Sequence, residues 1–365
     1  MDPDALEEEV EKWVRDGIIT EAQAEEILAR YEGDRSRGSR VVLALSLVGG
    51  ALVFAGVTLF LATNWEQLPR PARAAVLVAG PGLAYTGGAA AYNRNLPRIG
   101  LTLCVLGAVL VGPSLFLFED LLHLDIATAW LLLAWTAVAL PTGHALDSRA
   151  GTGFGLLVLV ALVVELVEPA EPVPVVGLLG VVLFALGHTR SGPVAWTYHV
   201  GGAAVTLGAL LVLTTLDGRF DRFDLDLTAP LVTGIAGAIA SVGWLGYSGD
   251  RNGSTWAAVG TLVLGGSVAV AALAPGTVPE LLAFAGTHLA ALVGLVVTGY
   301  LGYRTRSRRF IDLATVGGLL QTLSFVAATV IGELSGALAL VVAGLVLLAS
   351  GAALERGRRS LLADL

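Results

Sequence analysis

The amino-acid sequence predicts an all-α, polytopic membrane protein: a bundle of about twelve transmembrane helices behind a small N-terminal helical hairpin. Of its 365 residues, 55% are hydrophobic and only 14% are charged, whereas a soluble domain carries about 25% charged residues. The hydrophobic residues form long runs, and a helix needs about 20 such residues to cross a bilayer core. All 22 Lys and Arg residues lie outside these runs. Backbone amides in hydrocarbon must be paired within their own segment, so the runs predict helices.

Residues 1–33 are predicted to form the cytoplasmic hairpin, with its two helices within 4–32. Gly17 suits the left-handed position that ends a helix, and Thr20 with Gln23 is typical of a capping box. The apolar stripes of the two helices are Leu6, Val10, Trp13 and Val14, then Ala24, Ile27, Leu28 and Tyr31. So small a core is marginal alone. We therefore expect the hairpin to dock on another copy, a partner or the membrane surface, with Trp13 and Ile27 as candidate docking residues.

A basic linker, 34–40, precedes the transmembrane bundle at 41–355, and a cytoplasmic tail follows at 356–365. We expect the twelve runs at roughly 41–62, 74–92, 99–118, 127–146, 150–167, 173–188, 194–215, 229–248, 255–274, 281–303, 310–331 and 336–355. The fifth and sixth runs are short and separated only by EPAEP, so they form either a tight hairpin or one disrupted pair.

The cationic residues predict the orientation of the bundle. If the N-terminus is cytoplasmic, the cytoplasmic gaps after the hairpin hold 15 Arg residues and the opposite gaps hold 4, Arg70, Arg73, Arg219 and Arg222. This split agrees with the positive-inside rule. We expect a multi-pass protein of the cell membrane, surrounded by the lipid bilayer, with both termini in the cytoplasm.

Few ionisable or amide side chains lie within the runs. Those that do are functional candidates, because polar groups at membrane depth are costly. His199, His288 and Gln321 lie inside runs, and Glu165 lies near the outer end of one. A ligand-binding or proton-relay role is one interpretation. The other is structural: hydrogen bonds between helices for His199, His288 and Gln321, and solvation at the interface for Glu165.

The motifs of several enzyme classes are absent from the sequence. It has no phosphate-binding loop, no HExxH and no GxSxG, which disfavours an ATPase, a zinc protease and a serine hydrolase. Cys104 is the only cysteine, so neither a disulfide within the chain nor a cysteine metal cluster can form. We expect no catalytic residues, metal site or cofactor, and no nucleic-acid partner.

Three segments resemble a family of predicted membrane proteins named DUF2157. They are EKWVRDGIITEAQAEEILARY at 11–31, FLATNWEQLPRPAR at 60–73 and GPSLFLFEDLLHLD at 112–125. The resemblance covers about residues 5–140 and implies a membrane protein without an established activity. Within it, Asn64 and Trp65 stand at the expected outer boundary of the first span. Trp favours that boundary, so the pair is either an interfacial anchor or a ligand-facing motif.

Three functions fit these observations. The first is a transporter-like protein for a small or lipidic solute, favoured by the number of runs and by Pro81, Pro113 and Pro141 within them. The second is a non-catalytic membrane scaffold that docks partners through the hairpin. The third is a membrane-embedded lipid-modifying enzyme, which would need two or more titratable groups converging on one pocket.

Overall fold

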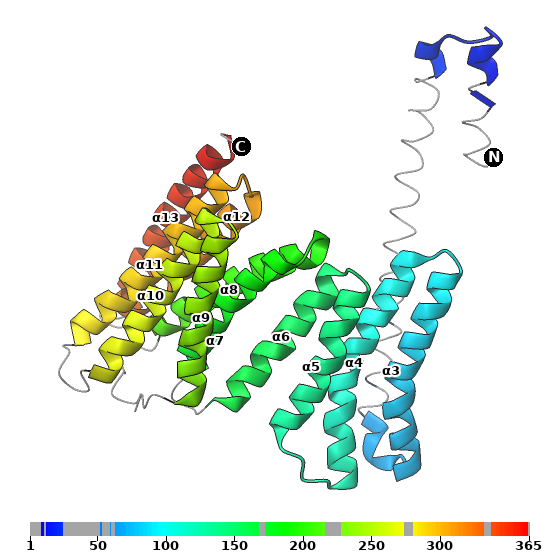
Figure 1. Ribbon diagram of the computed structural model, residues 1–365, viewed down its shortest axis with the longest axis horizontal. Coiled ribbons are helices and arrows are strands. Elements are labelled where there is room, and N and C mark those ends of the chain that lie inside the picture. Colours follow the sequence, from blue (N-terminus) through cyan, green and yellow to red (C-terminus); the bar gives the residue numbers. More distant parts are fainter. Residues whose placement is uncertain are drawn as a thin grey trace. The chain divides into compact units, whose positions relative to one another are not determined.

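A computed structural model of the chain describes residues 9–10, 12–24, 52, 59, 63–167, 172–215, 228–273, 280–331 and 337–363. Within these residues every regular element is a helix and none is a strand, which confirms the predicted all-α class (Figure 1). The contacts divide the chain into two units, Met1–Arg73 and Ala74–Leu365. Each unit is treated by itself below.

In the first unit, the turn of the predicted hairpin forms as the sequence indicates. Gly17 has φ 69°, and the N–H of Ile18 donates to the Trp13 carbonyl at 2.9 Å. This is the Schellman arrangement that ends a helix. The N–H of Thr20 donates to Gln23 Oε1 at 3.0 Å, and the N–H of Gln23 donates to Thr20 Oγ1 at 3.4 Å. The two bonds make the predicted capping box.

The hairpin encloses a small core. Val10 and Ala24 are buried, and Trp13, Val14 and Ile19 pack against them. Leu6, Ile27, Leu28 and Tyr31 lie outside the described residues, as do the linker at 34–40 and, apart from two isolated positions, the first predicted run at 41–62. The structure therefore describes the contact between the two apolar stripes only near the turn at Gly17.

The predicted runs from the second to the twelfth each correspond to one helix. These are α3 (Arg70–Asn93), α4 (Pro97–Leu122), α5 (Thr128–Ala145), α6 (Arg149–Leu166), α7 (Pro172–Leu186), α8 (Gly192–Thr215), α9 (Ala229–Tyr247), α10 (Arg251–Leu273), α11 (Glu280–Arg304), α12 (Arg308–Val326) and α13 (Ala337–Ala363). A π-helix, Ala327–Ile331, extends α12. α13 continues through the segment predicted as a tail. α6 and α7 are separate helices, with α6 packed mainly on α5 and α7 on α8.

Eight of the described helices are long and apolar enough to cross a membrane. They are α3, α4, α6, α8, α9, α11, α12 and α13, and α7 is a shorter apolar helix. This supports a multi-pass membrane protein. The total of about twelve spans stays a prediction, because α5, α7 and α10 do not meet the same criteria and the first run is not described.

Neighbouring helices approach each other closely at glycines. A Cβ on Gly180 of α7 would lie 2.6 Å from the Gly202 carbonyl oxygen of α8, and one on Gly202 would lie 2.5 Å from the Gly180 carbonyl oxygen. Gly88 of α3 and Gly100 of α4 meet in the same way. Lipid gives helices no hydrophobic drive to associate, so such close backbone contact gains dispersion energy instead.

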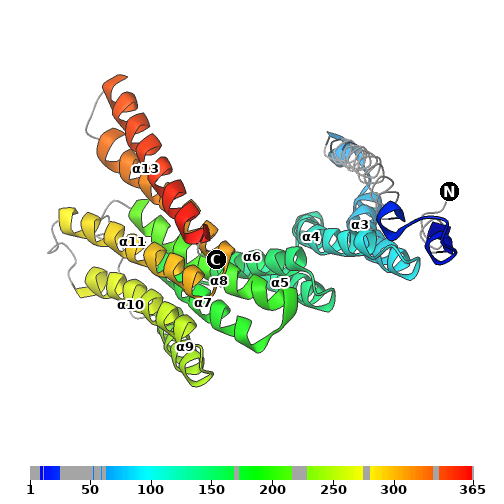
Figure 2. The same ribbon diagram turned by 90° about the horizontal axis from the view of Figure 1, so that it is seen from above.

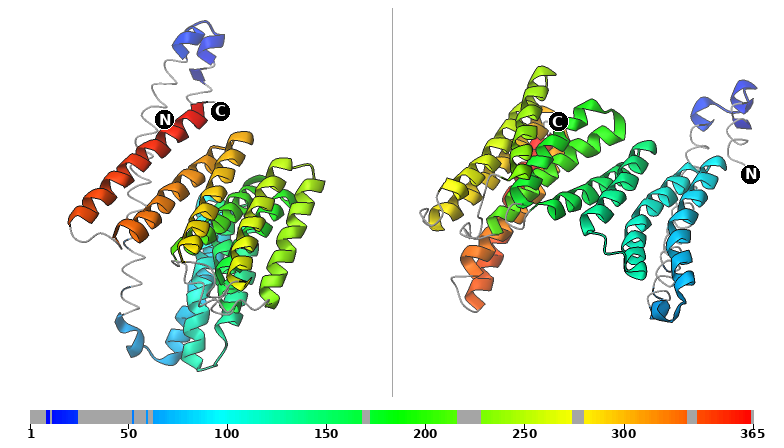
Figure 3. Two further views of the ribbon diagram at one scale, coloured as in Figure 1. Left: turned by 90° about the vertical axis from the view of Figure 1, so that its left-hand side faces the viewer. Right: turned by 60° about the horizontal axis from the view of Figure 1, so that its bottom comes forward.

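The main core lies around α8, more than half of whose span is buried. It packs against α7, α11 and α12, with Leu207 and Leu210 of α8 among the central side chains. α9, α10 and α11 pack one against the next in chain order (Figure 2), and each contributes buried side chains to this core. α13 lies beside α12 (Figure 3) and buries little of its surface.

The turns that carry arginine lie on one face of the second unit. Arg149 at the start of α6 and Arg309 at the start of α12 both lie over the ring of Trp196 at the start of α8. His188 after α7 contacts Asp250 before α10 at 2.7 Å. Arg358 near the end of α13 contacts Asp312 at 2.7 Å. These contacts bring together the turns before α6, α8, α10 and α12 and the end of α13, while the side of the membrane that they face stays a prediction.

Candidate functional site

A carboxylate and two imidazoles form a hydrogen-bonded chain on the arginine-bearing face. His188 lies in the 3₁₀ turn Gly187–Thr189 that follows α7, His199 lies on α8, and Asp250 precedes α10. His188 Nε2 is 2.7 Å from Asp250 Oδ2, and His188 Nδ1 is 2.9 Å from His199 Nε2. We call these three residues the histidine–aspartate chain.

The geometry orders the protons along this chain. The carboxylate accepts the Nε2–H of His188, which leaves Nδ1 of a neutral His188 free to accept the Nε2–H of His199. The other oxygen of Asp250 accepts the N–H of Gly253 at 2.9 Å, which caps α10 and fixes the carboxylate. Imidazole is the side chain suited to exchanging protons near neutral pH. The proton-relay role of His199 stays a prediction, which this arrangement of His188, His199 and Asp250 would suit.

Apolar side chains cover the inner side of the histidine–aspartate chain. The Phe184 ring centroid lies 5.2 Å from that of His199 and 4.4 Å from that of Trp256. Trp256 is buried and donates its Nε1–H to Thr298 Oγ1 at 2.9 Å. The His188 and Asp250 side chains remain 24% and 27% exposed. The chain thus runs from a solvent-accessible edge to a half-buried imidazole on α8.

Gly187 is required for the close approach of the two histidines. A Cβ at this position would lie 2.7 Å from Cδ2 of His199. Any larger residue would push the α8 ring away from the turn. The contact between the two histidines therefore needs a glycine directly before His188.

His288 of α11 and Gln321 of α12 form a second polar pair inside the bundle. His288 Nδ1 and Gln321 Nε2 are 2.6 Å apart, and both side chains are buried. The rings of Phe284 and Phe325 flank His288, with centroids at 4.2 and 5.4 Å. The pair joins two helices and is enclosed by aromatic rings. This geometry favours the structural interpretation, in which the pair is a hydrogen bond between helices.

Within the second unit, the remaining sequence candidate is not brought to either polar group. Glu165 is exposed near the end of α6. In the first unit, Trp65 begins a 3₁₀ turn directly after Asn64, and the Arg73 guanidinium lies 5.8 Å from its ring centroid. Arg73 also donates to the carbonyls of Glu66 and Leu68 at 2.6 and 2.8 Å. These contacts hold the turn in place, and the roles of Asn64 and Trp65 stay predictions.

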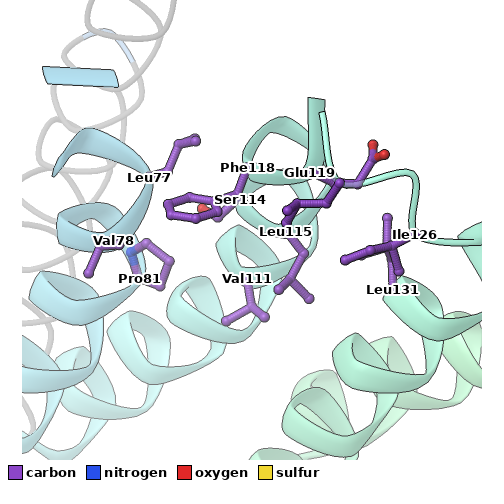
Figure 4. A pocket seen from close by; sticks show the side chains of 11 residues that line it. Leu77, Val78, Pro81, Val111, Ser114, Leu115, Phe118, Glu119, Ile126 and Leu131 are labelled. Atoms are coloured by element: carbon purple, nitrogen blue, oxygen red, sulfur yellow. The ribbon is translucent and has the colours of Figure 1, made fainter. Parts of the chain in front are cut away.

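An apolar hollow of about 380 Å³ lies among α3, α4 and α5. Figure 4 shows its side chains: Phe118 of α4 points toward Leu77 of α3, whereas Ile126 and Leu131 lie on the side away from α3 and the Glu119 carboxylate points toward that side. It is lined by Leu77, Val78 and Pro81 of α3, by Val111, Ser114, Leu115, Phe118 and Glu119 of α4, and by Leu124, Ile126 and Leu131. Ser114 and Glu119 are its polar lining residues, and Glu119 is the titratable one.

Sequence reasoning missed the partners of His199 and the hollow. Neither His188 nor Asp250 is among the candidates that the sequence predicts. Within the described residues, no group of three His, Cys, Asp or Glu side chains has the arrangement of a metal site. The histidine–aspartate chain is instead closed by its own hydrogen bonds.

Comparison with known proteins adds one finding. Residues 11–152 match the family model described as "Predicted membrane protein (DUF2157)". The resemblance is confirmed over this region. The DUF2157 match contains every residue that lines the hollow, whereas the histidine–aspartate chain and the His288–Gln321 pair lie beyond it. No curated protein and no solved structure matches the chain significantly.

Proposed function

We propose that this integral membrane protein is transporter-like and that its solute is lipidic. The observation that carries the proposal is the hollow among α3, α4 and α5. Its volume of about 380 Å³ falls within the range of about 300–1,000 Å³ typical of ligand sites. Ligand pockets are mostly apolar and carry a few polar groups that orient the ligand. Here the polar groups are Ser114 and Glu119.

The lining favours a hydrocarbon chain over a small polar solute. A polar solute that leaves water must regain its hydrogen bonds inside the site, or it loses free energy. Ser114 and Glu119 offer few such bonds, while Leu77, Leu115 and Phe118 offer apolar contact. Glu119 lies where α4 approaches the loop to α5, so it is placed to meet the polar end of a lipid whose chain occupies the hollow.

The buried polar pair supports a different role. His288 and Gln321 hydrogen-bond each other among aromatic rings, so we assign them to holding α11 against α12 rather than to the solute. A lipid-modifying enzyme would need at least two titratable groups converging on its pocket. Among the residues lining the hollow, Glu119 alone is titratable, so we do not propose catalysis.

The test is lipid translocation by the purified full-length chain in liposomes that contain NBD-labelled phosphatidylglycerol. Dithionite bleaches the label in the outer leaflet, and translocation exposes the inner label. We expect faster complete bleaching than in empty liposomes. Leu115→Trp fills the hollow and should slow translocation at least several-fold. The matched control is Leu117→Trp, at an exposed position on the same helix.

Two results would overturn this function. One is bleaching no faster than in empty liposomes, because the protein would then not translocate the labelled lipid. The other is an equal translocation rate for Leu115→Trp and Leu117→Trp, because the lipid would then not pass through the hollow. A phospholipid with a photoreactive acyl chain provides a second readout, because its cross-links should map to α3–α5 and be lost in Leu115→Trp.

A scaffold function has one supporting observation in the first unit. Ile18, in the hairpin turn, is 67% exposed, and Trp13 is only partly covered. A second copy of the chain would bury both. Under this alternative, light scattering of the purified protein would show a dimer for the wild type and a monomer for Ile18→Asp. A monomeric wild type would eliminate self-association through the hairpin.

A further inference from the structure

Two guanidinium groups stack on one indole at the arginine-bearing face. The Arg309 Cζ lies 4.1 Å from the Trp196 ring centroid, and the Arg149 Cζ lies 5.1 Å from it. Arg149 is the first residue of α6, Arg309 is the second of α12, and Trp196 is in the first turns of α8. We call these three residues the arginine–tryptophan cluster. It forms where three helices begin.

The positive charge of this cluster is not neutralised by a carboxylate. In the described part of the chain, neither Arg149 nor Arg309 forms an ion pair, because no carboxylate oxygen lies within 4.0 Å of its side-chain nitrogens. Nearby arginines differ, because Arg308 and Arg358 both contact Asp312, at 3.8 and 2.7 Å.

The surrounding groups leave a net positive environment. Each helix start adds the positive end of a helix dipole. Ser148 caps α6 by accepting the Gly151 N–H at 3.1 Å, whereas Ser307 makes no side-chain cap on α12. The carboxylate of Asp147 faces Gly192, at the first turn of α8. It compensates that helix start and does not pair with the two guanidiniums.

We propose that the arginine–tryptophan cluster binds the phosphate of an anionic phospholipid. A guanidinium presents a planar fork of N–H donors that matches phosphate oxygens. The contact with the Trp196 ring holds both guanidinium groups close together, at 4.1 and 5.1 Å from one ring centroid. Among the residues that the structure describes, the buried Nε1 of Trp196 has no hydrogen-bond partner, so the indole contributes its ring face.

The location identifies a lipid as the source of the phosphate. Apolar spans begin directly at the cluster, because α6, α8 and α12 are all candidate spans. A headgroup phosphate lies at this depth, and basic pockets between transmembrane helices are known to take such headgroups. Two arginines favour a lipid with two phosphates, such as cardiolipin. This site is separate from the hollow and does not depend on lipid translocation.

The test is native mass spectrometry of the full-length protein titrated with cardiolipin, phosphatidylglycerol or phosphatidylcholine. We expect retention to fall in that order. The loss of one hydrogen bond to a charged group weakens binding by about tenfold or more. The variant Arg149→Gln/Arg309→Gln should therefore bind cardiolipin about tenfold or more weakly. Arg309→Lys keeps the charge but loses the planar fork, and should weaken binding by a smaller factor.

The matched control is Arg94→Gln/Arg98→Gln, which removes two exposed arginines from the α3–α4 turn and should leave retention unchanged. Equal losses in the two double variants would overturn the site, since they would show only a general charge effect. Equal retention of phosphatidylcholine and cardiolipin would do the same. Displacement of cardiolipin by millimolar inorganic phosphate would show that the site takes free phosphate, and would overturn the lipid assignment.

Discussion

The carboxylate of Asp250 joins two helical hairpins through His188. Its Oδ2 accepts from His188 Nε2 at 2.7 Å, while its Oδ1 accepts the Gly253 N–H at 2.9 Å. One side chain therefore caps α10 and anchors the turn between α7 and α8. Because His188 also contacts His199, the position of an imidazole on the central helix depends on a residue from a different hairpin.

Asp250→Asn separates these two roles. Asparagine keeps an oxygen for the α10 cap but removes the charge that His188 meets. We expect a loss of about 1–2 kcal/mol in the free energy of unfolding, because a charge-assisted hydrogen bond becomes a neutral one. We also expect altered ¹⁵N signals from the imidazoles of His188 and His199. Asp250→Ala also loses the cap and should cost more.

Asp125→Asn is the control for this experiment, because it removes a carboxylate from an exposed loop. Denaturant unfolding in detergent and ¹⁵N-histidine spectra give the two readouts. If Asp250→Asn and Asp125→Asn gave the same unfolding curve and the same histidine spectrum, the hydrogen-bonded chain would not exist in solution.

Gly202→Ala should destabilise the α7–α8 contact. The added Cβ would meet the Gly180 carbonyl oxygen at 2.5 Å, and backbone cannot move aside as a flexible side chain can. Overpacking of this kind costs about 1–3 kcal/mol. Gly208→Ala on the same helix meets nothing within 4 Å and should be neutral or slightly stabilising. Thermal unfolding of the two variants compares them, and equal melting temperatures would contradict the close contact.

His288 and Gln321 should be energetically coupled. In a double-mutant cycle of His288→Leu, Gln321→Leu and the double variant, we expect a coupling free energy of about 0.6 kcal/mol and at most about 1.7 kcal/mol, the range measured for hydrogen bonds between membrane helices. Thr322 bonds the Gly318 carbonyl of its own helix, so a cycle of His288→Leu with Thr322→Val should give none. A coupling free energy of zero in the first cycle would show that the pair does not hold α11 against α12.

Local sequence signals predicted the elements of the fold well. Run lengths located the helices from α3 to α13, because hydrocarbon imposes one length and one secondary structure on a span. The Gly17 turn and the Thr20–Gln23 capping box were also predictable, since each is made by residues close in sequence.

The candidate sites were harder to predict because they depend on contacts between hairpins. His188 lies in the turn between α7 and α8, and His199 lies on α8 soon after it. Their closeness in the sequence could therefore have indicated that the two imidazoles meet. Asp250 belongs to another turn, and its contact follows from the packing of α7 against α9 and α10. The hollow depends on how α3, α4 and α5 diverge, which no residue pattern encodes.

The final prediction concerns the sidedness of the arginine turns, which we propose face the cytoplasm. Cys104 is the only cysteine, so Cys104→Ser gives a background for single cysteines. Ser191→Cys and Thr305→Cys probe the arginine-bearing face, and Ala127→Cys and Ala229→Cys probe the opposite ends of their helices. In intact cells, an impermeant maleimide should label positions 127 and 229 only, and should label all four after permeabilisation. Labelling at 191 and 305 instead would invert the orientation. Opposite results at 191 and 305 would contradict the grouping of these turns on one face, because the contacts among Arg149, Trp196 and Arg309 require both turns to lie on the same side.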